Sequence, residues 1–218
     1  GAGAVTLTTS TNDFTGAVSL NNSGVNAIQV TDTNAIVLGT VTTANNLIVS
    51  GVGITQDTGG LTVTGASTFN GGAGAVTLTT STNDFTGAVS LNNSGANAIQ
   101  VTDTNAIVLG AITTASNLTV VAGGAMTDNG ILNVTGASSF TSGGNIILDN
   151  ANTFTGTVSV SLPTGSDLTL ADSTALDLNH LTLSTLQVNN LNVTAVGITQ
   201  TDNLIVTGAS TFNGGAGA

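Results

Sequence analysis

The chain has 218 residues, of which 40% are hydrophobic and only 5% are charged, and its formal net charge is −11. It contains no Lys, Arg or Cys, so it has no cation for nucleic-acid phosphates or anionic lipid surfaces and no disulfides. No apolar run reaches the roughly 18 residues of a membrane span. No signal peptide opens the chain, and we interpret Gly1 as an internal cut.

Short runs in which apolar and polar residues alternate begin near the N-terminus and recur along the chain. In the first unit they cover residues 5–7, 18–20, 28–30, 36–38, 47–49 and 61–63. Alternation over three to five residues predicts a short strand with one buried face. Clusters of Asn, Asp and Gly separate these runs and predict turns. No stretch has a capped apolar period of 3.6 residues, so we expect essentially no helix.

The chain is a tandem repeat. LTVTGASTF at 61–69 returns as LNVTGASSF at 132–140 and LIVTGASTF at 204–212, and residues 5–39 return at 76–110 with the single change of Val25 to Ala96. The opening GAGA and closing GGAGA match, which indicates a 214-residue super-repeat. We divide the chain into three units of one continuous solenoid, approximately 1–72, 73–144 and 145–218.

The third unit contains apolar residues that step by five. The first series is Leu176, Leu181, Leu186, Leu191 and Val196, and each has an apolar partner two residues on, at Leu178, Leu183, Val188, Val193 and Ile198. A three-residue strand followed by a two-residue corner produces this spacing, so we expect both series to point inward.

These features predict an all-β parallel β-helix (β-solenoid) of about 10–12 coils with three sides per coil. A sandwich or barrel turns every 8–12 residues, whereas many spacings here are shorter. Stacked coils bury Val, Ile and Leu and pair their backbones from coil to coil. At about 4.8 Å per coil, the rod is on the order of 50 Å long.

The segments VTLTTSTNDFTGAVSLNNSG, AIQVTDTNAIVLG and LTVTGASTF resemble repeats of large bacterial filamentous-haemagglutinin-type and autotransporter exoproteins, many of which are adhesins. The resemblance implies a right-handed parallel β-helix that is exported to the cell surface. The secretion domain and receptor-binding tip of such proteins have no counterpart in these segments, so the resemblance assigns no adhesive residue.

Several residues are candidates for a binding or catalytic site. The glycine-rich segment 71–75 lacks the Lys and the helix of a phosphate loop and the Asp of a calcium-binding repeat, so we interpret it as a corner. Asp residues at equivalent places in the units are expected to cap turns rather than share a calcium ion, because whole units, roughly 14–19 Å, separate them. The first series is Asp32, Asp103 and Asp172, and the second is Asp13 and Asp84, with Thr153 in the third unit.

The other candidate residues are better explained by structural roles than by chemistry. Asp167, Asp172 and Asp177 are five residues apart, which places them on different sides or corners of one coil. The chain has no Lys or Arg that could act as a base beside them. His180 is the only histidine. We expect the six phenylalanines to fill the core: Phe14, Phe69, Phe85, Phe140, Phe154 and Phe212. We therefore predict no catalytic, cofactor-binding or metal-ligating residue, no cofactor and no enzyme activity.

The function we predict is that of a structural stalk or filament segment of a giant bacterial extracellular or cell-surface adhesin-like protein. The alternatives are a Thr-rich surface that binds ice or glycan and a consensus or designed solenoid scaffold. The expected partners are further solenoid coils at both ends, from the same chain or from head-to-tail copies, and possibly other cell-surface components. Nucleic acid and anionic membrane surfaces are not expected partners.

Overall fold

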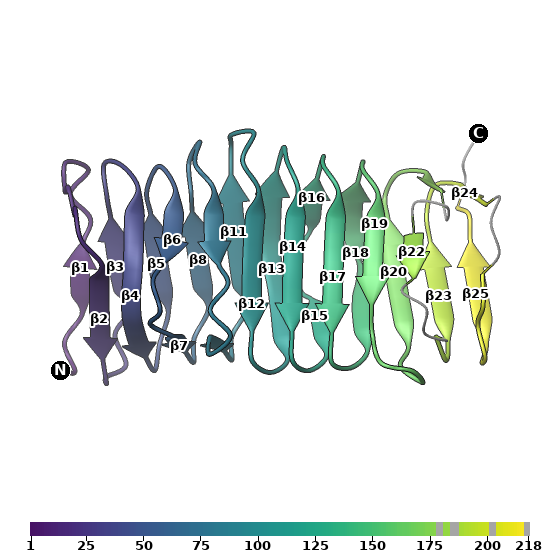
Figure 1. Cartoon of the computed structure of the whole chain (residues 1–218), viewed down its shortest axis with the longest axis horizontal. Helices are drawn as coiled ribbons and strands as arrows, with labels where there is room; N and C mark the ends of the chain where they lie inside the picture. The colour runs from purple at the N-terminus through teal and green to yellow at the C-terminus, as the bar shows by residue number, and fades with distance from the viewer. Residues whose placement is uncertain (178–180, 184–187, 201–203, 216–218) are drawn as a thin grey trace.

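The computed structural model describes residues 1–177, 181–183, 188–200 and 204–215; the side chains of 181–183 fall outside the description. These residues form an all-β parallel solenoid of about 10 turns, and none of them is helical. The coils stack into a straight rod with the two termini at opposite ends (Figure 1). The predicted fold class is confirmed.

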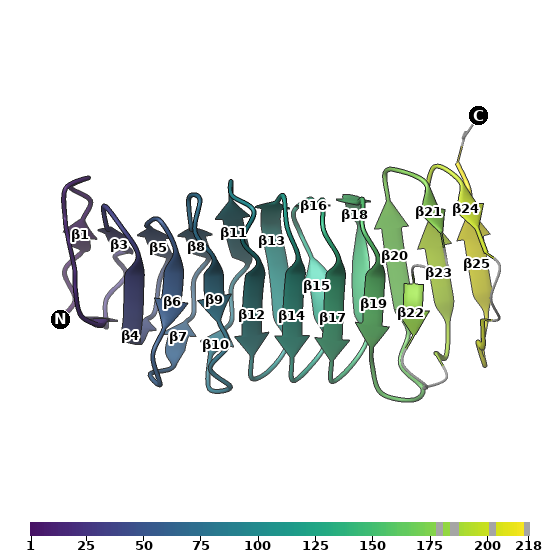
Figure 2. The same ribbon diagram turned by 45° about the horizontal axis from the view of Figure 1, so that its top comes forward.

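Two sheets run along the rod on opposite sides of a shared core (Figure 2). The first sheet contains β1 (Val5–Leu7), β3 (Ile28–Thr31), β5 (Leu47–Ser50), β8 (Ser67–Asn70), β11 (Val89–Asn93), β13 (Ile107–Thr114), β15 (Met126–Asp128), β16 (Leu132–Val134), β18 (Ile146–Phe154), β20 (Leu168–Asp172), β23 (Leu191–Thr194) and β25 (Ser210–Asn213). The second contains β2 (Val18–Asn22), β4 (Ile36–Thr43), β6 (Ile54–Gln56), β7 (Leu61–Val63), β9 (Val76–Leu78), β10 (Asp84–Phe85), β12 (Ile99–Asp103), β14 (Leu118–Ala122), β17 (Ser138–Ser142), β19 (Val158–Ser161) and β22 (Leu181–Leu183). A small third sheet pairs β21 (Leu176–Asp177) with β24 (Ile198–Thr199).

The strands form where the sequence alternates, and every predicted triplet of the first unit lies within one of them. In β14 the residues Leu118, Val120 and Ala122 point inward and are at most 3% exposed. Each strand pairs in parallel with the next coil, as Leu118 does with Ser138. The backbone groups are thereby satisfied between coils while the aliphatic side chains fill one continuous core.

Each coil has a short side and a long side. In most coils the long side is either one bent strand or two short strands in the same sheet, so two of the three predicted sides share a sheet. In the coils of β20 and β23 the third side instead forms the separate sheet of β21 and β24. In β13 the bend falls at Gly110: Val89 lies opposite Leu109, but Leu91 lies opposite Ile112. A Cβ at Gly110 would meet the hydroxyl of Ser90, which would have to turn away, so glycine gives the bulge room for this side chain.

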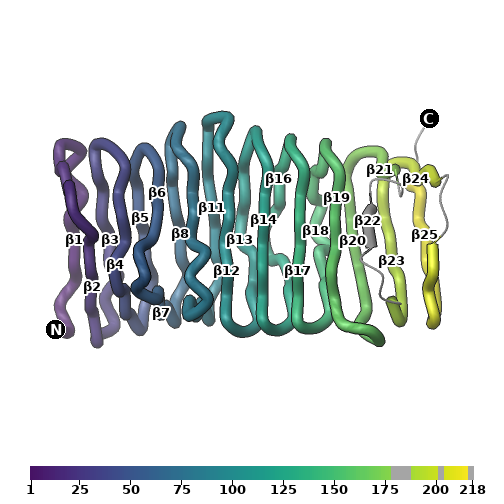
Figure 3. The backbone as a smooth tube through the Cα atoms, in the orientation of Figure 1, coloured from purple at the N-terminus to yellow at the C-terminus, as the bar shows by residue number. Residues whose placement is uncertain are grey.

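Each 71-residue unit spans three and a half coils, because it contributes an odd number of sides. Seven sides make up one unit: β9 with β10, β11, β12, β13, β14, β15 with β16, and β17. Consequently Phe69 lies in the first sheet, Phe140 in the second and Phe212 in the first again. Identical side chains of successive units therefore do not stack directly over one another, since successive units lie on opposite faces, a half-turn apart. The corner between β2 and β3 and that between β11 and β12 accordingly lie at opposite edges of the rod (Figure 3).

The five-residue stepping of the third unit is confirmed in part. Leu176, Val188, Leu191 and Val193 are at most 3% exposed, and Ile198 packs partly against the core. Val196 is 46% exposed, which contradicts the prediction; it lies in the corner after β23, where its N–H binds the carbonyl of Thr174. Leu178, His180 and Leu186 lie outside the described residues, as do the side chains of Leu181 and Leu183.

The phenylalanine prediction is confirmed inside the rod and fails at one end. Four rings are buried, at Phe69, Phe85, Phe140 and Phe154. Phe69 and Phe85 meet edge-to-face with centroids 6.0 Å apart, as do Phe140 and Phe154 at 5.8 Å. On the terminal coils Phe14 is half-buried and Phe212 is 47% exposed.

Candidate functional site

The first candidate site is the buried aspartate at the end of β12. Asp103 is 1% exposed, and its Oδ1 accepts the N–H of Asn105 at 3.2 Å. Its Oδ2 accepts the N–H of Phe85, from the preceding coil, at 3.3 Å. Asp32 makes the same pair of bonds at 3.1 Å to the N–H groups of Asn34 and Phe14. The expected turn-capping role is therefore what these carboxylates perform.

The third member of the series is only half satisfied. Asp172 Oδ1 accepts the N–H of Thr174 at 2.9 Å and its hydroxyl at 2.8 Å. Asp172 Oδ2 is buried with no hydrogen-bond partner. In this unit β18 continues through Phe154 as one strand, so the local chain path differs from that before Phe85.

The three carboxylates cannot share a ligand. Asp32 follows β3 and Asp172 ends β20, both in the first sheet, whereas Asp103 ends β12 in the second. Asp167, Asp172 and Asp177 lie before β20, at its end and in β21, and the described part of the chain contains no group of three His, Cys, Asp or Glu residues that would hold a metal. Asp13 and Asp84 instead accept the side-chain amides of Asn34 at 3.3 Å and Asn105 at 3.0 Å.

Two carboxyl groups have shifted pKa values with identifiable causes. Burial raises the pKa of Asp103 to about 6, although hydrogen bonds from the N–H groups of Asn105 and Phe85 act in the opposite direction. The side-chain amide of Asn189, at 2.9 Å, lowers the pKa of Asp167, and Asn190 adds two further hydrogen bonds. Asp167 thus fastens the start of β20 to the following coil.

Sequence reasoning missed a buried asparagine at a long-side corner. Asn83 is 0% exposed, and its Oδ1 accepts the N–H of Leu61 at 3.0 Å and the side-chain amide of Gln56 at 2.6 Å. Its Nδ2 donates to the carbonyl of Leu78 at 3.2 Å. Asn152 repeats this by accepting from the N–H of Leu132 at 2.8 Å. The sequence did contain a signal for this role, because Asn precedes the Asp-Phe or Thr-Phe pair in all three units.

The segment 71–75 forms a corner, as predicted. Gly72 has a φ of +54°, which favours glycine, and the N–H of Gly74 binds the carbonyl of Gly71 at 3.0 Å. The carbonyl of Gly72 then accepts the N–H of Ser94 at 2.8 Å from the next coil. The glycines therefore hold coils together.

Among the described residues, the outward row of the first sheet is not a regular array of threonine. The outward row of the first sheet includes Thr6, Gln29, Ile48, Thr68 and Ser90 in successive coils, and further on Val108, Thr127, Ile147, Thr169, Asn192 and Thr211. A flat ice-binding face would need the same residue in every coil, so this row does not favour the alternative of an ice-binding surface.

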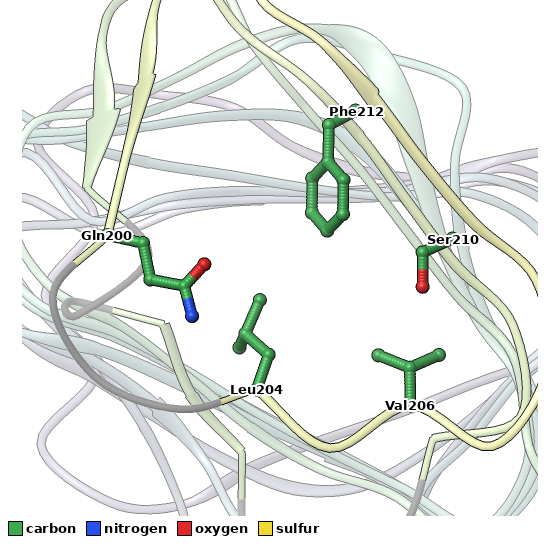
Figure 4. A pocket seen from close by; sticks show the side chains of 5 residues that line it. All are labelled: Gln200, Leu204, Val206, Ser210 and Phe212. Atoms are coloured by element: carbon green, nitrogen blue, oxygen red, sulfur yellow. The ribbon is translucent and has the colours of Figure 1, made fainter.

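The second candidate site is a hollow of about 410 Å³ in the C-terminal coil. The side chains of Gln200, Leu204, Val206, Ser210 and Phe212 line it and point toward one another (Figure 4). The apolar residues of this lining have fully buried counterparts in the first unit. These are Leu61, Val63 and Phe69, each 0% exposed. The hollow is therefore core-type surface that no further coil covers within the described chain.

The N-terminal coil also exposes residues whose counterparts in the second unit are buried. Leu7 is 39% exposed and Val5 is half-buried. Their counterparts Leu78 and Val76 in the second unit are both 0% exposed. Both ends of the rod thus expose residues that the interior buries.

The architecture agrees with a comparison to protein families. One family model, described as repeats of unknown function (DUF5649), matches residues 1–21, 25–92, 96–161 and 165–218. No curated protein and no solved structure matches the chain. The part of the chain that the structure describes includes no helix with the length and apolarity to cross a bilayer. The chain belongs to the family of repeats of unknown function (DUF5649) and is a structural repeat protein built as a β-solenoid.

Proposed function

We propose that this chain is a stalk or filament segment of a large bacterial extracellular, cell-surface protein of the adhesin type, and that it acts as a spacer rather than an enzyme. The observation that carries the proposal is the unbroken pairing of coils along both sheets. Each coil extends the rod by about 4.8 Å and contacts only its neighbours, so added repeats lengthen the rod without altering its core.

Composition supports the same function. With no Lys or Arg and a net charge of −11, the rod repels other acidic surfaces and lacks the cations that bind nucleic acid or anionic lipid. The motif resemblance to haemagglutinin-type and autotransporter repeats supports location outside the cell. In this function the partners are further solenoid coils at each end and other cell-surface components.

Immunogold electron microscopy of the bacterial source tests the proposal. Antibodies against the folded chain should label intact cells, on projections that extend from the surface. A periplasmic or cytoplasmic protein provides the control, because its antibody labels only permeabilised cells. Labelling of this chain only after permeabilisation would overturn the proposal.

A further inference from the structure

Asparagine followed by glycine is the pair at which a polypeptide most readily modifies itself, because glycine has no Cβ to hinder attack by its own nitrogen on the asparagine amide. The chain contains three such pairs, at 70–71, 129–130 and 213–214. We propose that Asn129 is a self-modification site, at which the chain converts this asparagine into aspartate or isoaspartate without an enzyme. The pair at 70–71 is the internal comparison, because the fold protects it.

The reaction consumes water and releases ammonia. The backbone nitrogen of Gly130 loses its proton and attacks Cγ of Asn129, so that a new N–Cγ bond forms, the Cγ–Nδ2 bond breaks and ammonia leaves. The product is a cyclic succinimide, which water opens at either carbonyl. Attack of water at Cγ restores the normal backbone with aspartate, whereas attack at the backbone carbonyl leaves the chain connected through the side chain as isoaspartate.

Both reacting groups are free at this pair. Asn129 is exposed in the corner between β15 and β16. Among the described residues, neither its side-chain amide nor the N–H of Gly130 has a hydrogen-bond partner. The backbone N–H of Asn129 donates to the carbonyl of Leu109 at 2.8 Å, which fixes the residue in the corner. The side chain can therefore rotate toward the Gly130 nitrogen without breaking a hydrogen bond.

The corresponding groups of Asn70 and Gly71 are held by neighbouring coils. The Gly71 N–H donates to the carbonyl of Asn92 at 2.8 Å. The Asn70 side chain donates to the hydroxyl of Ser50 at 3.3 Å and accepts the side-chain amide of Asn92 at 3.0 Å. Reaction at Asn70 requires these bonds to open first, so the folded rod slows it.

The packing of the coils explains why glycine follows Asn129. A Cβ on Gly130 would collide with the backbone of Ala111, and Gly59 meets the neighbouring coil in the same way at this corner of the first unit. The corner comprises residues 57–60 in the first unit but only 129–131 in the second. In the shorter corner the asparagine directly precedes the glycine that packing requires, so the fold itself maintains the reactive pair.

The aspartate product fits the fold. Asp57 occupies the equivalent corner of the first unit, where its N–H donates to the carbonyl of Leu38 at 2.9 Å as the N–H of Asn129 does to β13. The Asp57 carboxylate accepts the N–H of Gly59 at 2.6 Å. Aspartate at position 129 therefore adds one negative charge to the rod and leaves the path of the chain unchanged.

The isoaspartate product strains the same corner, because it lengthens the backbone by one atom between two anchored residues. Before the corner, Asp128 accepts the side-chain amide of Asn152 at 2.7 Å. After the corner, the N–H of Leu132 donates to Asn152 Oδ1 at 2.8 Å. The added atom must shift β16 against its partners β13 and β18, so we expect the pairing of β16 to weaken.

The test measures deamidation of the folded chain at mildly alkaline pH, where the glycine nitrogen loses its proton more readily. Chymotryptic peptides and electron-transfer mass spectrometry resolve the three pairs and distinguish isoaspartate from aspartate. Asn129 should react at least about 10-fold faster than Asn70, because three hydrogen bonds protect the second pair. In urea the two pairs should react at similar rates, which attributes the difference to the fold.

Two variants at the same position separate reactivity from packing. Asn129→Gln keeps an amide but requires a larger ring, so ammonia release from this corner should cease. Asn129→Asp imitates the first product and should leave circular dichroism and thermal unfolding unchanged.

The proposal is overturned if Asn70 reacts as fast as Asn129 in the folded chain. It is equally overturned if Asn129 stays intact in the folded chain while both pairs react in urea. Hydrogen exchange tests the effect of the second product: chains with isoaspartate should exchange faster in β16 than unreacted chains, and unchanged exchange there would refute the strain at the corner.

Discussion

Residues 5–20 and residues 76–91 have the same sequence but differ in burial. Leu7 is 39% exposed whereas Leu78 is fully buried, and Phe14 is half-buried whereas Phe85 is fully buried. The later segment lies between two coils, whereas within the described residues the earlier one contacts a coil on one side. The comparison shows that burial in this molecule is determined by the stack of coils, as expected when each repeat contacts only its neighbours.

The largest difference between the two segments should come from a buried charge. Leu78→Asp places an unpaired carboxylate in the core and should cost about 3–5 kcal/mol, whereas Leu7→Asp should cost less than about 1 kcal/mol because water reaches that side chain. Hydrogen exchange should localise the damage in Leu78→Asp to the coils adjacent to β9. If urea denaturation showed that the two variants lose the same free energy of unfolding, the difference in burial would be contradicted.

Truncating Phe85 and Phe14 should give a smaller difference in lost stability between the two segments, in the same direction. Phe85→Ala leaves a cavity beside Phe69 and should cost about 3–5 kcal/mol. Phe14→Ala removes a half-buried ring and should cost about half as much. Thermal unfolding of both variants measures the difference. A larger loss for Phe14→Ala would show that the terminal coil is packed as tightly as the interior.

The interior aspartate should make stability depend on pH. The pKa of Asp103 is raised by burial to about 6 from 3.8, so the folded state binds its proton more tightly than the unfolded state does. Its contribution is fully present below pH 3.8 and is lost as the pH rises through about 6, and the loss between pH 4 and pH 7 should be about 2 kcal/mol. Comparing urea denaturation of the wild type and Asp103→Asn at pH 4 and pH 7 isolates this group from the other aspartates. The variant should lose less stability than the wild type between these two pH values, and an unchanged difference would refute the assignment.

The smallest predicted effect is a gain in stability. The hydroxyl of Ser67 is buried without a hydrogen-bond partner, so Ser67→Ala should raise the free energy of unfolding by about 1 kcal/mol. The counterpart Ser210 is exposed, and Ser210→Ala should change stability by less than about 0.5 kcal/mol. A loss of stability in Ser67→Ala would indicate that the hydroxyl has a partner such as water.

The fold was predictable because its signal is local. Alternation such as that of residues 61–63 identifies a strand and its inward face, and near-identical units that each consist of short strands indicate a stack of repeated coils. The capping role of Asp103 was predictable for the same reason, since an Asx turn involves a residue only two positions away. What these features share is that a few neighbouring residues determine them.

The half-turn was not predictable from the same signals. It depends on whether a unit contains an even or odd number of sides, and bent strands such as β13 look like two sides in the sequence. The prediction that Val196 points inward was wrong because a five-residue step does not distinguish a residue at the end of a strand from a residue in the corner that follows. Asn83 was missed because asparagine in a turn-rich segment usually faces water, whereas here the adjacent coils supply its partners.

The central claim is that 71 residues make three and a half coils, and one distance tests it. Val25 and Ala96 are equivalent, exposed corner residues, and the chain has no native cysteine. A Val25→Cys, Ala96→Cys variant therefore carries two spin labels for a pulsed electron paramagnetic resonance measurement. With a half-turn the two corners lie at opposite edges of the rod, and the distance should be about 30 Å, from roughly 17 Å along the axis and the length of an eight-residue strand across it. A distance of about 14–19 Å, the spacing of three or four whole coils, would contradict the account.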